Sequence, residues 1–364
     1  MKKYFLYELK KARWELIIIS VLFTLLCATV AAVSPMQTVY NRYMEDGEVV
    51  TRVVIQTPVL PLAVGLLALM CYAAPAGAYA FKMNKRSVDC YYALPIKKEK
   101  LYLVKTLIGL LLVFIPFTLA YWTMVLVYAI RPNNPYEMVW FVPAYFGLIF
   151  FGVCLYGYNA FAFTRGNSMQ DGITFMVAYS AVLICVALVP FIWSKGELFS
   201  WQVLLGLWPG YGGIMFTSNM LVRIMGESAE YIATSGIKLD ALTFIMPFIQ
   251  GAAGYSLLFV LVRKDKAEDS QQVCESWFGY KVLIPIFTAV SAGLLVGALI
   301  ETTWTVALVV FVMIAVAAFV SIIVWRRKFN FGKTGWIVLG VGLGAAIVIA
   351  FITTLIFNPY LHGW

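Results

Sequence analysis

The sequence predicts an all-α polytopic membrane protein, on the basis of its composition, its recurring apolar runs and the placement of its charges. Of 364 residues, 62% are hydrophobic and only 12% are charged. A soluble domain of this composition could not cover its surface with polar groups. Runs of about 20 apolar residues, long enough to cross a ~30 Å hydrocarbon layer as a helix, recur along the whole chain.

Charged clusters and Pro/Gly-rich clusters divide the apolar sequence into nine expected spans. The spans cover residues 15–34, 57–81, 101–130, 138–164, 172–194, 241–262, 282–300, 302–325 and 335–357. Residues 1–14 are expected to form a basic amphipathic helix on the membrane surface, with Tyr4, Phe5 and Leu9 facing lipid. The alternative is a basic N-terminus that only sets the orientation of the chain.

The Lys and Arg residues predict the orientation of the chain in the membrane. With the N-terminus in the cytoplasm, 21 of the 27 basic residues fall on the cytoplasmic side and 6 fall outside. This asymmetry follows the positive-inside rule. The net charge of +9 is therefore interpreted as an orientation signal, and a nucleic-acid partner is not expected. The prediction is a multi-pass cell-membrane protein with a cytoplasmic N-terminus and an extracellular C-terminus.

Residues 201–222 are apolar enough to cross the membrane, but a crossing there would invert every later segment. Their middle, the hairpin residues Trp208, Pro209, Gly210, Gly212 and Gly213, is unfavourable for a continuous helix. Non-helical backbone at membrane depth needs cover from protein or a water-filled cavity. We expect a re-entrant hairpin on the outer side, with a kinked span as the alternative.

The sequence offers no recognisable catalytic or metal-binding constellation. The single histidine, His362, is the third residue from the end, and the six cysteines show no metal-ligand spacing. Residues 332–334 (Gly-Lys-Thr) resemble the end of a phosphate-binding loop, but Arg327 stands where its first Gly would be. The small-xxx-small spacings of residues 293–297 and 340–344 indicate close helix packing. We expect neither an enzyme nor a metal or cofactor site.

No acidic or basic residue falls near the middle of any expected span. Ion-coupled carriers usually place a carboxylate or broken-helix carbonyls at the midplane. If this chain moves a substrate, the energy is expected to come from outside the membrane domain.

Residues 82–100 form a basic segment between two apolar spans and contain a short amphipathic stretch. Ser87 is expected to cap a short helix, Asp89 lies in its first turn, and Pro95 ends it. Such a helix could insert into a groove of a soluble ATPase, or it could rest on anionic lipid. The expected docking side chains are Arg86, Val88, Asp89, Tyr91, Tyr92, Leu94 and Pro95.

Three stretches in order resemble the type-2 ABC exporter permeases of Gram-positive bacteria. Residues 84–97 (Asn-Lys-Arg-Ser-Val-Asp-Cys-Tyr-Tyr-Ala-Leu-Pro-Ile-Lys), followed by Leu101 and Lys105, resemble the first cytoplasmic loop of that family. Residues 163–170 (Phe-Thr-Arg-Gly-Asn-Ser-Met-Gln) are similar to its Thr-x-Gly-Asn loop after the fourth span. Residues 263–268 resemble its Arg-x-x-x-Ala/Ser-Glu exit from the sixth span.

The resemblance implies a six-span core, here residues 15–275, with a surface helix at 1–14, a coupling helix near 84–95 and a re-entrant hairpin near 201–222. It implies a homodimer, or a heterodimer with a second permease, bound to separate ABC ATP-binding subunits. ATP and Mg would then be bound by those subunits, and this chain would bind no cofactor. The block 276–364, with about three more spans, lies outside the core that the resemblance explains.

An ATP-driven exporter permease for an amphipathic or hydrophobic substrate, such as a peptide antibiotic, a lipid or a drug, is the favoured function. Tyr145, Tyr156, Tyr158 and Asn159 on the fourth span are candidates for a substrate path, with ordinary aromatic packing as the alternative. The competing functions are a non-transporting scaffold or sensor subunit of an ATPase complex and a secondary carrier.

Overall fold

Helices dominate the computed structural model of the chain. It describes residues 2–33, 37–45, 48–56, 59–131, 136–193, 208–224, 241–274, 276, 278–299, 304–327 and 332–357. The long helices are α1 (Lys2–Val33), α2 (Val59–Tyr79), α4 (Lys98–Ile130), α5 (Phe141–Thr164), α6 (Met169–Trp193), α10 (Ala241–Leu261), α11 (Tyr280–Leu299), α12 (Trp304–Arg326) and α13 (Gly332–Phe357).

Each predicted span overlaps one of these helices, so the prediction of a helical chain with repeated apolar segments is confirmed, while nine membrane crossings stay a prediction. Six helical stretches within the described residues are long and apolar enough to cross a membrane. This is the architecture of a multi-pass membrane protein. The shorter elements are α3 (Lys85–Tyr92), α8 (Pro209–Ile224) and the 3-10 turns η1 (Ala80–Met83), η2 (Met138–Trp140) and η3 (Val262–Lys264).

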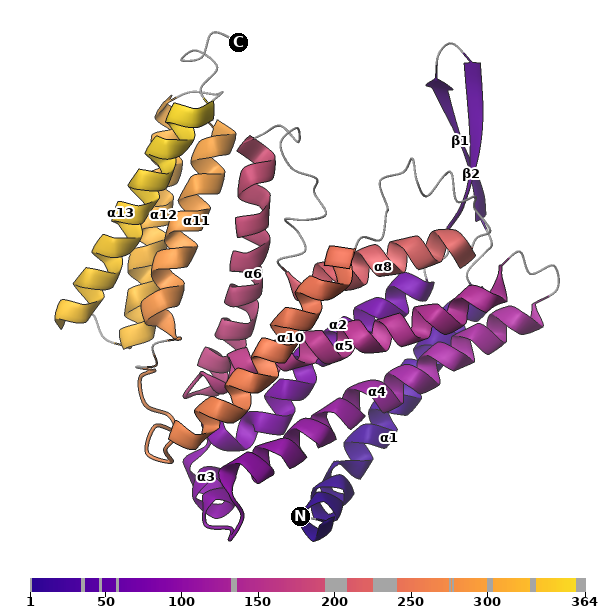
Figure 1. Ribbon diagram of the computed structural model, residues 1–364, viewed down its shortest axis with the longest axis horizontal. Helices are drawn as coiled ribbons and strands as arrows, with labels where there is room; N and C mark the ends of the chain where they lie inside the picture. The colour runs from indigo at the N-terminus through magenta and orange to yellow at the C-terminus, as the bar shows by residue number, and fades with distance from the viewer. Residues whose placement is uncertain are drawn as a thin grey trace.

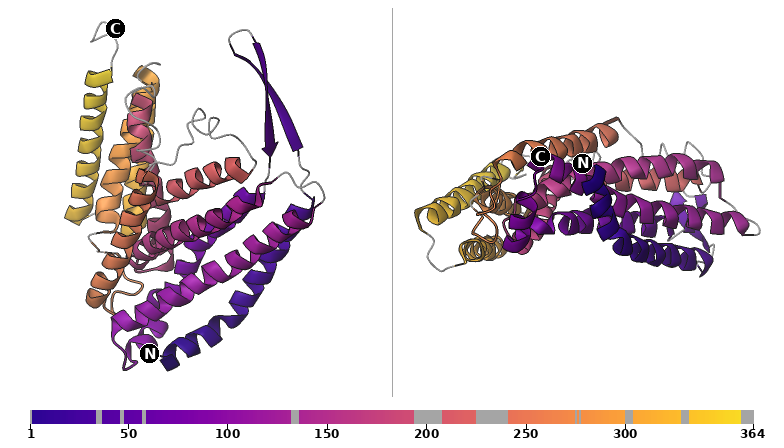
Figure 2. Two further views of the ribbon diagram at one scale, coloured as in Figure 1. Left: turned by 45° about the vertical axis from the view of Figure 1, so that its right-hand side comes forward. Right: turned by 90° about the horizontal axis from the view of Figure 1, so that it is seen from below.

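The N-terminal helix differs from the expectation of a separate surface helix, because α1 is one continuous helix of 32 residues. Its first turns bend away from the axis of the remainder (Figure 2). Tyr4, Phe5 and Leu9 pack against the core of the protein, while Leu6 and Tyr7 are exposed. The predicted lipid-facing side is therefore wrong, because buried partners on α3 and α4 attract the side of α1 that carries Tyr4 and Glu8.

A β-hairpin between α1 and α2 is an element that the all-α prediction missed. Strands β1 (Gln37–Glu45) and β2 (Glu48–Gln56) pair antiparallel, with Gln37 opposite Gln56. The sequence does carry the signal, since an Asp-Gly pair at 46–47 is flanked by residues rich in Val, Tyr and Thr. The hairpin projects from the end of the bundle opposite to the N-terminus and α3 (Figure 1).

The main core lies among α1, α2, α4, α5, α8 and α10, where fully buried aromatic side chains fill the space between helices. Gly157 of α5 and Gly254 of α10 bring two backbones together, because a Cβ on Gly254 would lie 2.7 Å from the Gly157 carbonyl oxygen. Small residues permit such close contacts in membrane helices. The α5–α10 contact places the end of α10 beside the end of α5.

The C-terminal helices form a second group that packs on α6 (Figure 1). Phe175 of α6, Tyr280 of α11 and Trp325 of α12 belong to one buried cluster. The packing expected around residues 340–344 comes from Gly342, whose Cβ would lie 3.2 Å from Pro285 Cα, while Gly340 and Gly344 face open space. The prediction that Gly340 and Gly344 form the packing surface is wrong, because Gly342, which lies between them, faces α11.

Helix α8 differs from the expected break around Trp208–Gly213. Pro209 occupies the first helical position, where its missing N–H costs nothing. Gly212 packs closely against α10, since a Cβ there would meet the Thr243 carbonyl oxygen at 2.7 Å. The glycines serve close packing and do not interrupt the helix. Residues 201–207 lie outside the described residues, and whether 201–222 re-enters or crosses the membrane stays a prediction.

Candidate functional site at the α3 end of the bundle

Helix α3 is a short helix fixed between the ends of α2 and α4. Asn84 caps its N-terminus, since the Asn84 side-chain oxygen accepts a hydrogen bond from the Arg86 backbone N–H at 3.1 Å. The cap is therefore Asn84. Ser87, the expected cap, is the third residue of α3. The helix ends at Tyr92, before Pro95. Asn is as good a cap as Ser, and its position one residue after η1 lets it begin α3 directly.

The inner face of α3 packs on the chain itself. Val88 is 1% exposed, and the ring of Tyr91 lies 4.8 Å from that of Phe81. The Tyr92 hydroxyl approaches the Tyr102 hydroxyl at 3.5 Å, and burial raises the pKa of Tyr92. The expectation that Val88 is a docking side chain is wrong, because a partner cannot reach it. Tyr91 and Tyr92 are half-buried and hold α3 on the bundle.

The outer face of α3 and the turn after it remain open. Arg86, Asp89, Leu94 and Pro95 are exposed, and Leu94 borders a cavity that is also lined by Tyr7 of α1. Docking of an ATPase here stays a prediction, and these four side chains are the members of the predicted set that a partner could contact. The structure separates the set into an inner group that positions the helix and an outer group that is accessible from outside the bundle.

A buried ion pair joins α1 to α4 beneath Tyr91. Lys105 Nζ lies 2.7 Å from Glu8 Oε2, with both side chains less than 10% exposed. Tyr4 donates a hydrogen bond to Glu8 at 3.0 Å. Lys105 also donates to the Tyr91 hydroxyl at 3.3 Å, and its ammonium lies 4.6 Å from the centre of the Tyr91 ring. The Glu8–Lys105 pair therefore connects α3 to two long helices.

A second buried cluster gathers three charged residues from distant parts of the chain, and we call Lys82, Arg165 and Asp265 the Asp265 cluster. Lys82 Nζ lies 3.0 Å from Asp265 Oδ2, and Arg165 Nη2 lies 3.6 Å from the same oxygen. Lys82 also donates to the Thr164 carbonyl. Each side chain is 8–11% exposed. The cluster ties the end of α2 to the ends of α5 and α10.

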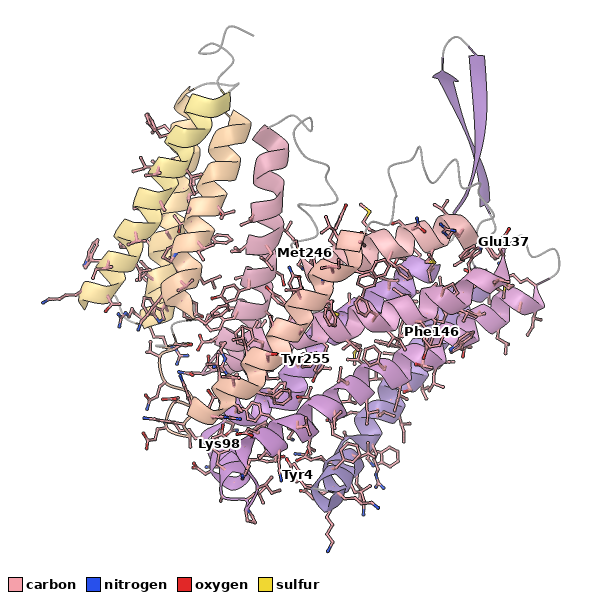
Figure 3. All side chains as sticks on the ribbon, viewed as in Figure 1. Tyr4, Lys98, Glu137, Phe146, Met246 and Tyr255 are labelled. Carbon is pink, nitrogen blue, oxygen red and sulfur yellow. The ribbon has the colours of Figure 1, made fainter. Side chains whose placement is uncertain are left out.

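Two hydrogen bonds link the Asp265 cluster to α4, and Lys98 of α4 in turn contacts α3. Tyr102 donates to Asp265 Oδ2 at 3.5 Å, and Lys98 donates to the Asp265 carbonyl at 2.6 Å. The Lys98 ammonium also lies 4.7 Å from the centre of the Tyr92 ring. Lys98 lies at the same end of the bundle as Tyr4 (Figure 3). Sequence reasoning did not select Lys82, Arg165 or Asp265 as site residues, although residues 163–170 and 263–268 were singled out as motifs.

The same end of the bundle connects to the C-terminal helices through polar contacts. Tyr280 of α11 donates to Asp171 at 2.8 Å, and Arg327 lies 3.6 Å from the same carboxylate. Trp325 donates to the Cys274 carbonyl at 2.9 Å, and the Cys274 thiol donates to the Arg165 carbonyl at 3.4 Å. Burial raises the pKa of Cys274, which lowers the reactivity of its thiol.

The four candidate path residues of α5 do not meet in one place. Tyr145 shares a hydrogen bond with Thr118 of α4 at 2.9 Å, and Tyr156 is fully buried against Gly109 of the same helix. Asn159 instead donates to the Cys71 carbonyl of α2 at 3.1 Å. Tyr158 is half-buried. None of the four lines one of the cavities described here, and their role in a substrate path stays a prediction.

An apolar cavity lies elsewhere, between α2, α5 and α8, and has a volume of about 320 Å³. We call it the α2–α5–α8 cavity. Trp208, Gly210 and Gly213 of the expected hairpin line it, opposite Leu67 of α2. Trp208 Nε1 is buried and has no hydrogen-bond partner among the described atoms. The walls of the cavity are predominantly apolar, the pattern of a site for a mainly apolar ligand.

Among the described residues, no three His, Cys, Asp or Glu side chains come together as they would around a metal ion. Comparison of the chain with protein-family models, with curated proteins and with solved structures found no match.

Proposed function

We propose that this chain is the membrane permease subunit of an ATP-driven ABC-type exporter, and that a separate ATP-binding subunit docks on the outer face of α3. The observation that carries the proposal is the division of α3 into a buried inner face and an exposed outer face. A helix that merely rested on lipid would not need Val88, Tyr91 and Tyr92 to fix it on three neighbouring elements.

The contacts beneath α3 would carry a displacement of that helix into the membrane domain. Tyr91 contacts Lys105, which is paired with Glu8 of α1. Tyr92 contacts Tyr102, which donates to Asp265 at the end of α10. A push on α3 would therefore act on α1, α4 and α10 together. Rigid elements with shared polar contacts are suited to such transmission.

The distribution of acidic residues favours an external energy source over ion coupling. In the described long helices, Glu99 of α4 and Asp171 of α6 lie in first turns, and Glu8 and Glu15 lie in the first half of α1. A secondary carrier that uses a midplane carboxylate is disfavoured. A non-transporting scaffold or sensor subunit would use the same docking face and remains the alternative function.

The apolar α2–α5–α8 cavity supports a hydrophobic or amphipathic cargo. The arrangement we propose is a six-helix core with three additional C-terminal spans, an N-terminus in the cytoplasm of a bacterial cell and an extracellular C-terminus. A second permease copy, identical or homologous, would complete the transporter. ATP and Mg would be bound by the partner subunit.

The test is reconstitution with an ABC-type ATP-binding subunit, for which genes adjacent to that of this chain would be the first candidates. Leu94→Ala combined with Arg86→Ala should weaken association by about 2 kcal/mol, close to 30-fold in Kd, because an apolar docking contact and a charged contact are lost. Leu119→Ala, at an exposed leucine of α4 away from α3, is the matched control and should have no effect. Measurements are binding in nanodiscs and substrate-stimulated ATP hydrolysis.

Unchanged affinity in the Leu94 and Arg86 variant would overturn docking on α3. Normal docking and ATP hydrolysis with no transport of any member of a lipid and peptide panel would favour the scaffold or sensor function.

A further inference from the structure

Helices α4 and α10 converge at the α3 end of the bundle and separate away from it (Figure 1). Two contacts set their register at this end. Arg263 Nε lies 2.8 Å from Glu99 Oε1, and Lys98 Nζ donates to the Asp265 carbonyl at 2.6 Å. The start of α4 is therefore level with η3, which follows α10. With increasing depth in the bundle, residue numbers rise along α4 and fall along α10.

A groove of about 260 Å³ lies between these two helices, and we call it the α4–α10 groove. Its lining at the level of the ion pair is charged and consists of Glu99, Lys100 and Arg263. The expected span of α4 begins at residue 101, and that of α10 ends at residue 262. The three charged side chains thus lie where the apolar segments meet water, the level at which basic residues and lipid headgroups occur.

The lining becomes apolar one helical turn deeper. Leu103 comes four residues after Glu99, which is about 6 Å along α4. On α10, Phe259 and Val260 precede Arg263 by about one turn. Leu103 and Val260 are exposed. Because no water is present at membrane depth, exposed apolar side chains of a membrane-spanning helix face hydrocarbon.

The apolar surface continues along both helices beyond the lining of the groove. Leu107 of α4 and Leu257 of α10, each about one turn deeper, are also exposed. The α4–α10 groove therefore has its charges at the level of the interface, with an apolar surface leading away from them. An acyl chain can lie on this surface without any opening of the helix bundle.

The charges of the lining sum to one net positive charge. Glu99 is paired with Arg263, whereas Lys100 is exposed and has no ion pair among the described contacts. Arg263 uses Nε for the contact with Glu99, and a guanidinium carries further N–H donors on its two terminal nitrogens. Lys100 and Arg263 can thus both donate to the oxygens of one phosphate, the group that Arg binds with two parallel hydrogen bonds.

The same charges favour an anionic headgroup over a zwitterionic one. Glu99 is the single acid of the lining, and Arg263 already neutralises it. An ammonium group of a ligand would therefore meet no unpaired carboxylate among the lining residues. Lys264, next to Arg263, is exposed and adds to the positive charge of this surface. Basic pockets between membrane helices bind anionic headgroups for this reason.

We propose that the α4–α10 groove binds one anionic glycerophospholipid from the leaflet at the α3 end. The phosphate contacts Lys100 and Arg263, and one acyl chain lies along Leu103 and Val260. Glu99 holds the Arg263 guanidinium at the mouth of the groove. This inference does not rest on the exporter proposal.

The test is native mass spectrometry of the full chain, delipidated and then titrated with phosphatidylglycerol or with phosphatidylethanolamine of the same acyl chains. The wild-type chain should retain one phosphatidylglycerol in preference to phosphatidylethanolamine. Lys100→Gln should lower phosphatidylglycerol retention about fivefold, and Lys100→Glu on the order of 25-fold, because each unit of charge changes the attraction to an anionic lipid by a similar factor. Lys10→Gln, at an exposed lysine of α1 that does not line the groove, is the matched control and should leave retention unchanged.

A second pair of variants tests the acyl contact. Val260→Trp places a large side chain in the apolar part of the groove and should lower phosphatidylglycerol retention about tenfold, comparable to the lost burial of about two CH₂ groups. Val316→Trp, at a valine of α12 that is exposed to nearly the same extent, is the matched control. Inorganic phosphate at millimolar concentration should not displace the retained lipid.

Three results would overturn the proposal. Equal retention of both lipids by the wild-type chain, or equal loss in Lys100→Gln and Lys10→Gln, would indicate only a general attraction of lipid to a basic surface. Equal effects of Val260→Trp and Val316→Trp would remove the acyl chain from the groove. Displacement of phosphatidylglycerol by inorganic phosphate would show a site for phosphate alone and not for a phospholipid.

Discussion

The two buried ionic clusters at the α3 end of the bundle differ in their balance of charge. In the Glu8–Lys105 pair, one carboxylate meets one ammonium at 2.7 Å, and Tyr4 and Tyr91 supply further hydrogen bonds. In the Asp265 cluster, one carboxylate serves two cations, at 3.0 and 3.6 Å. Arg165 Nε and Nη2 are buried there without a hydrogen-bond partner.

The two clusters therefore stabilise the packing of the helices in different ways. A one-to-one pair fixes α1 on α4 and is complete in itself. A shared carboxylate joins the ends of α2, α5 and α10 and leaves an excess of positive charge. Since a buried charge without a partner costs several kcal/mol, the stability of the Asp265 cluster depends on a single acid.

Loss of that acid should have the largest effect. Asp265→Asn leaves Lys82 and Arg165 buried without a counter-ion, and we expect a loss of about 3 to 5 kcal/mol in the free energy of unfolding in mixed micelles. The Cys274 thiol, which contacts the Arg165 carbonyl, should become reactive towards a soluble maleimide. The exposed Cys90 is the internal control and should react at the same rate in both proteins. Unchanged stability and an unreactive Cys274 would show that the cluster is not held by Asp265.

Glu8→Gln should have a smaller effect, because Lys105 keeps the Tyr91 hydroxyl and a neutral acceptor. We expect a loss of about 2 kcal/mol in the free energy of unfolding, in the range of a hydrogen bond to a charged group. The same mixed-micelle unfolding measurement applies. A loss as large as that of Asp265→Asn would remove the distinction between the two clusters.

The sequence predicts features that depend on neighbouring residues better than features that depend on residues far apart in the chain. The nine apolar segments were predictable because a span is a local property of about 20 consecutive residues. The partners of Asp265 were not, since Lys82 and Arg165 meet it only after α2, α5 and α10 have packed. The inner face of α3 was misjudged for the same reason: Val88 has the pattern of a docking residue, and only the positions of its neighbours show that it is buried.

Two local sequence signals, at residues 46–47 and at Pro209, were also misinterpreted. The Asp-Gly pair at 46–47 indicates the β1–β2 hairpin, but residues 35–56 fall between two expected spans, and no secondary structure was predicted there. Pro209 was taken to break a helix, whereas at the first position it begins α8. A proline breaks a helix only in its interior, and Pro209 lies at the first position of α8.

A double substitution measures the balance within the Glu8–Lys105 pair. Glu8→Gln with Lys105→Gln removes both charges and keeps side chains that can hydrogen-bond to one another. We expect the double variant to be about 1 kcal/mol more stable than the sum of the single losses predicts, which is the coupling energy of two groups in contact. Additive losses in a full double-mutant cycle of unfolding would show that the two residues stabilise the fold independently.

The smallest effect on the free energy of unfolding is expected for Arg165, one of the two cations that share Asp265. Arg165→Met removes the second cation of the Asp265 cluster and its unpartnered nitrogens, while a long apolar side chain still covers the Phe161 ring, 5.7 Å from the guanidinium. Lys82 then neutralises Asp265 alone, as Lys105 neutralises Glu8. Because replacing a poorly paired buried ion by an apolar group is often neutral or stabilising, the free energy of unfolding should change by less than about 1 kcal/mol. A matched Lys82→Met variant should cost more, since Lys82 is the closer partner of Asp265 and also bonds the Thr164 carbonyl. If Arg165→Met proved the more damaging of the two, Arg165 would be the true counter-ion of Asp265, and the cluster would carry its excess charge on Lys82 instead.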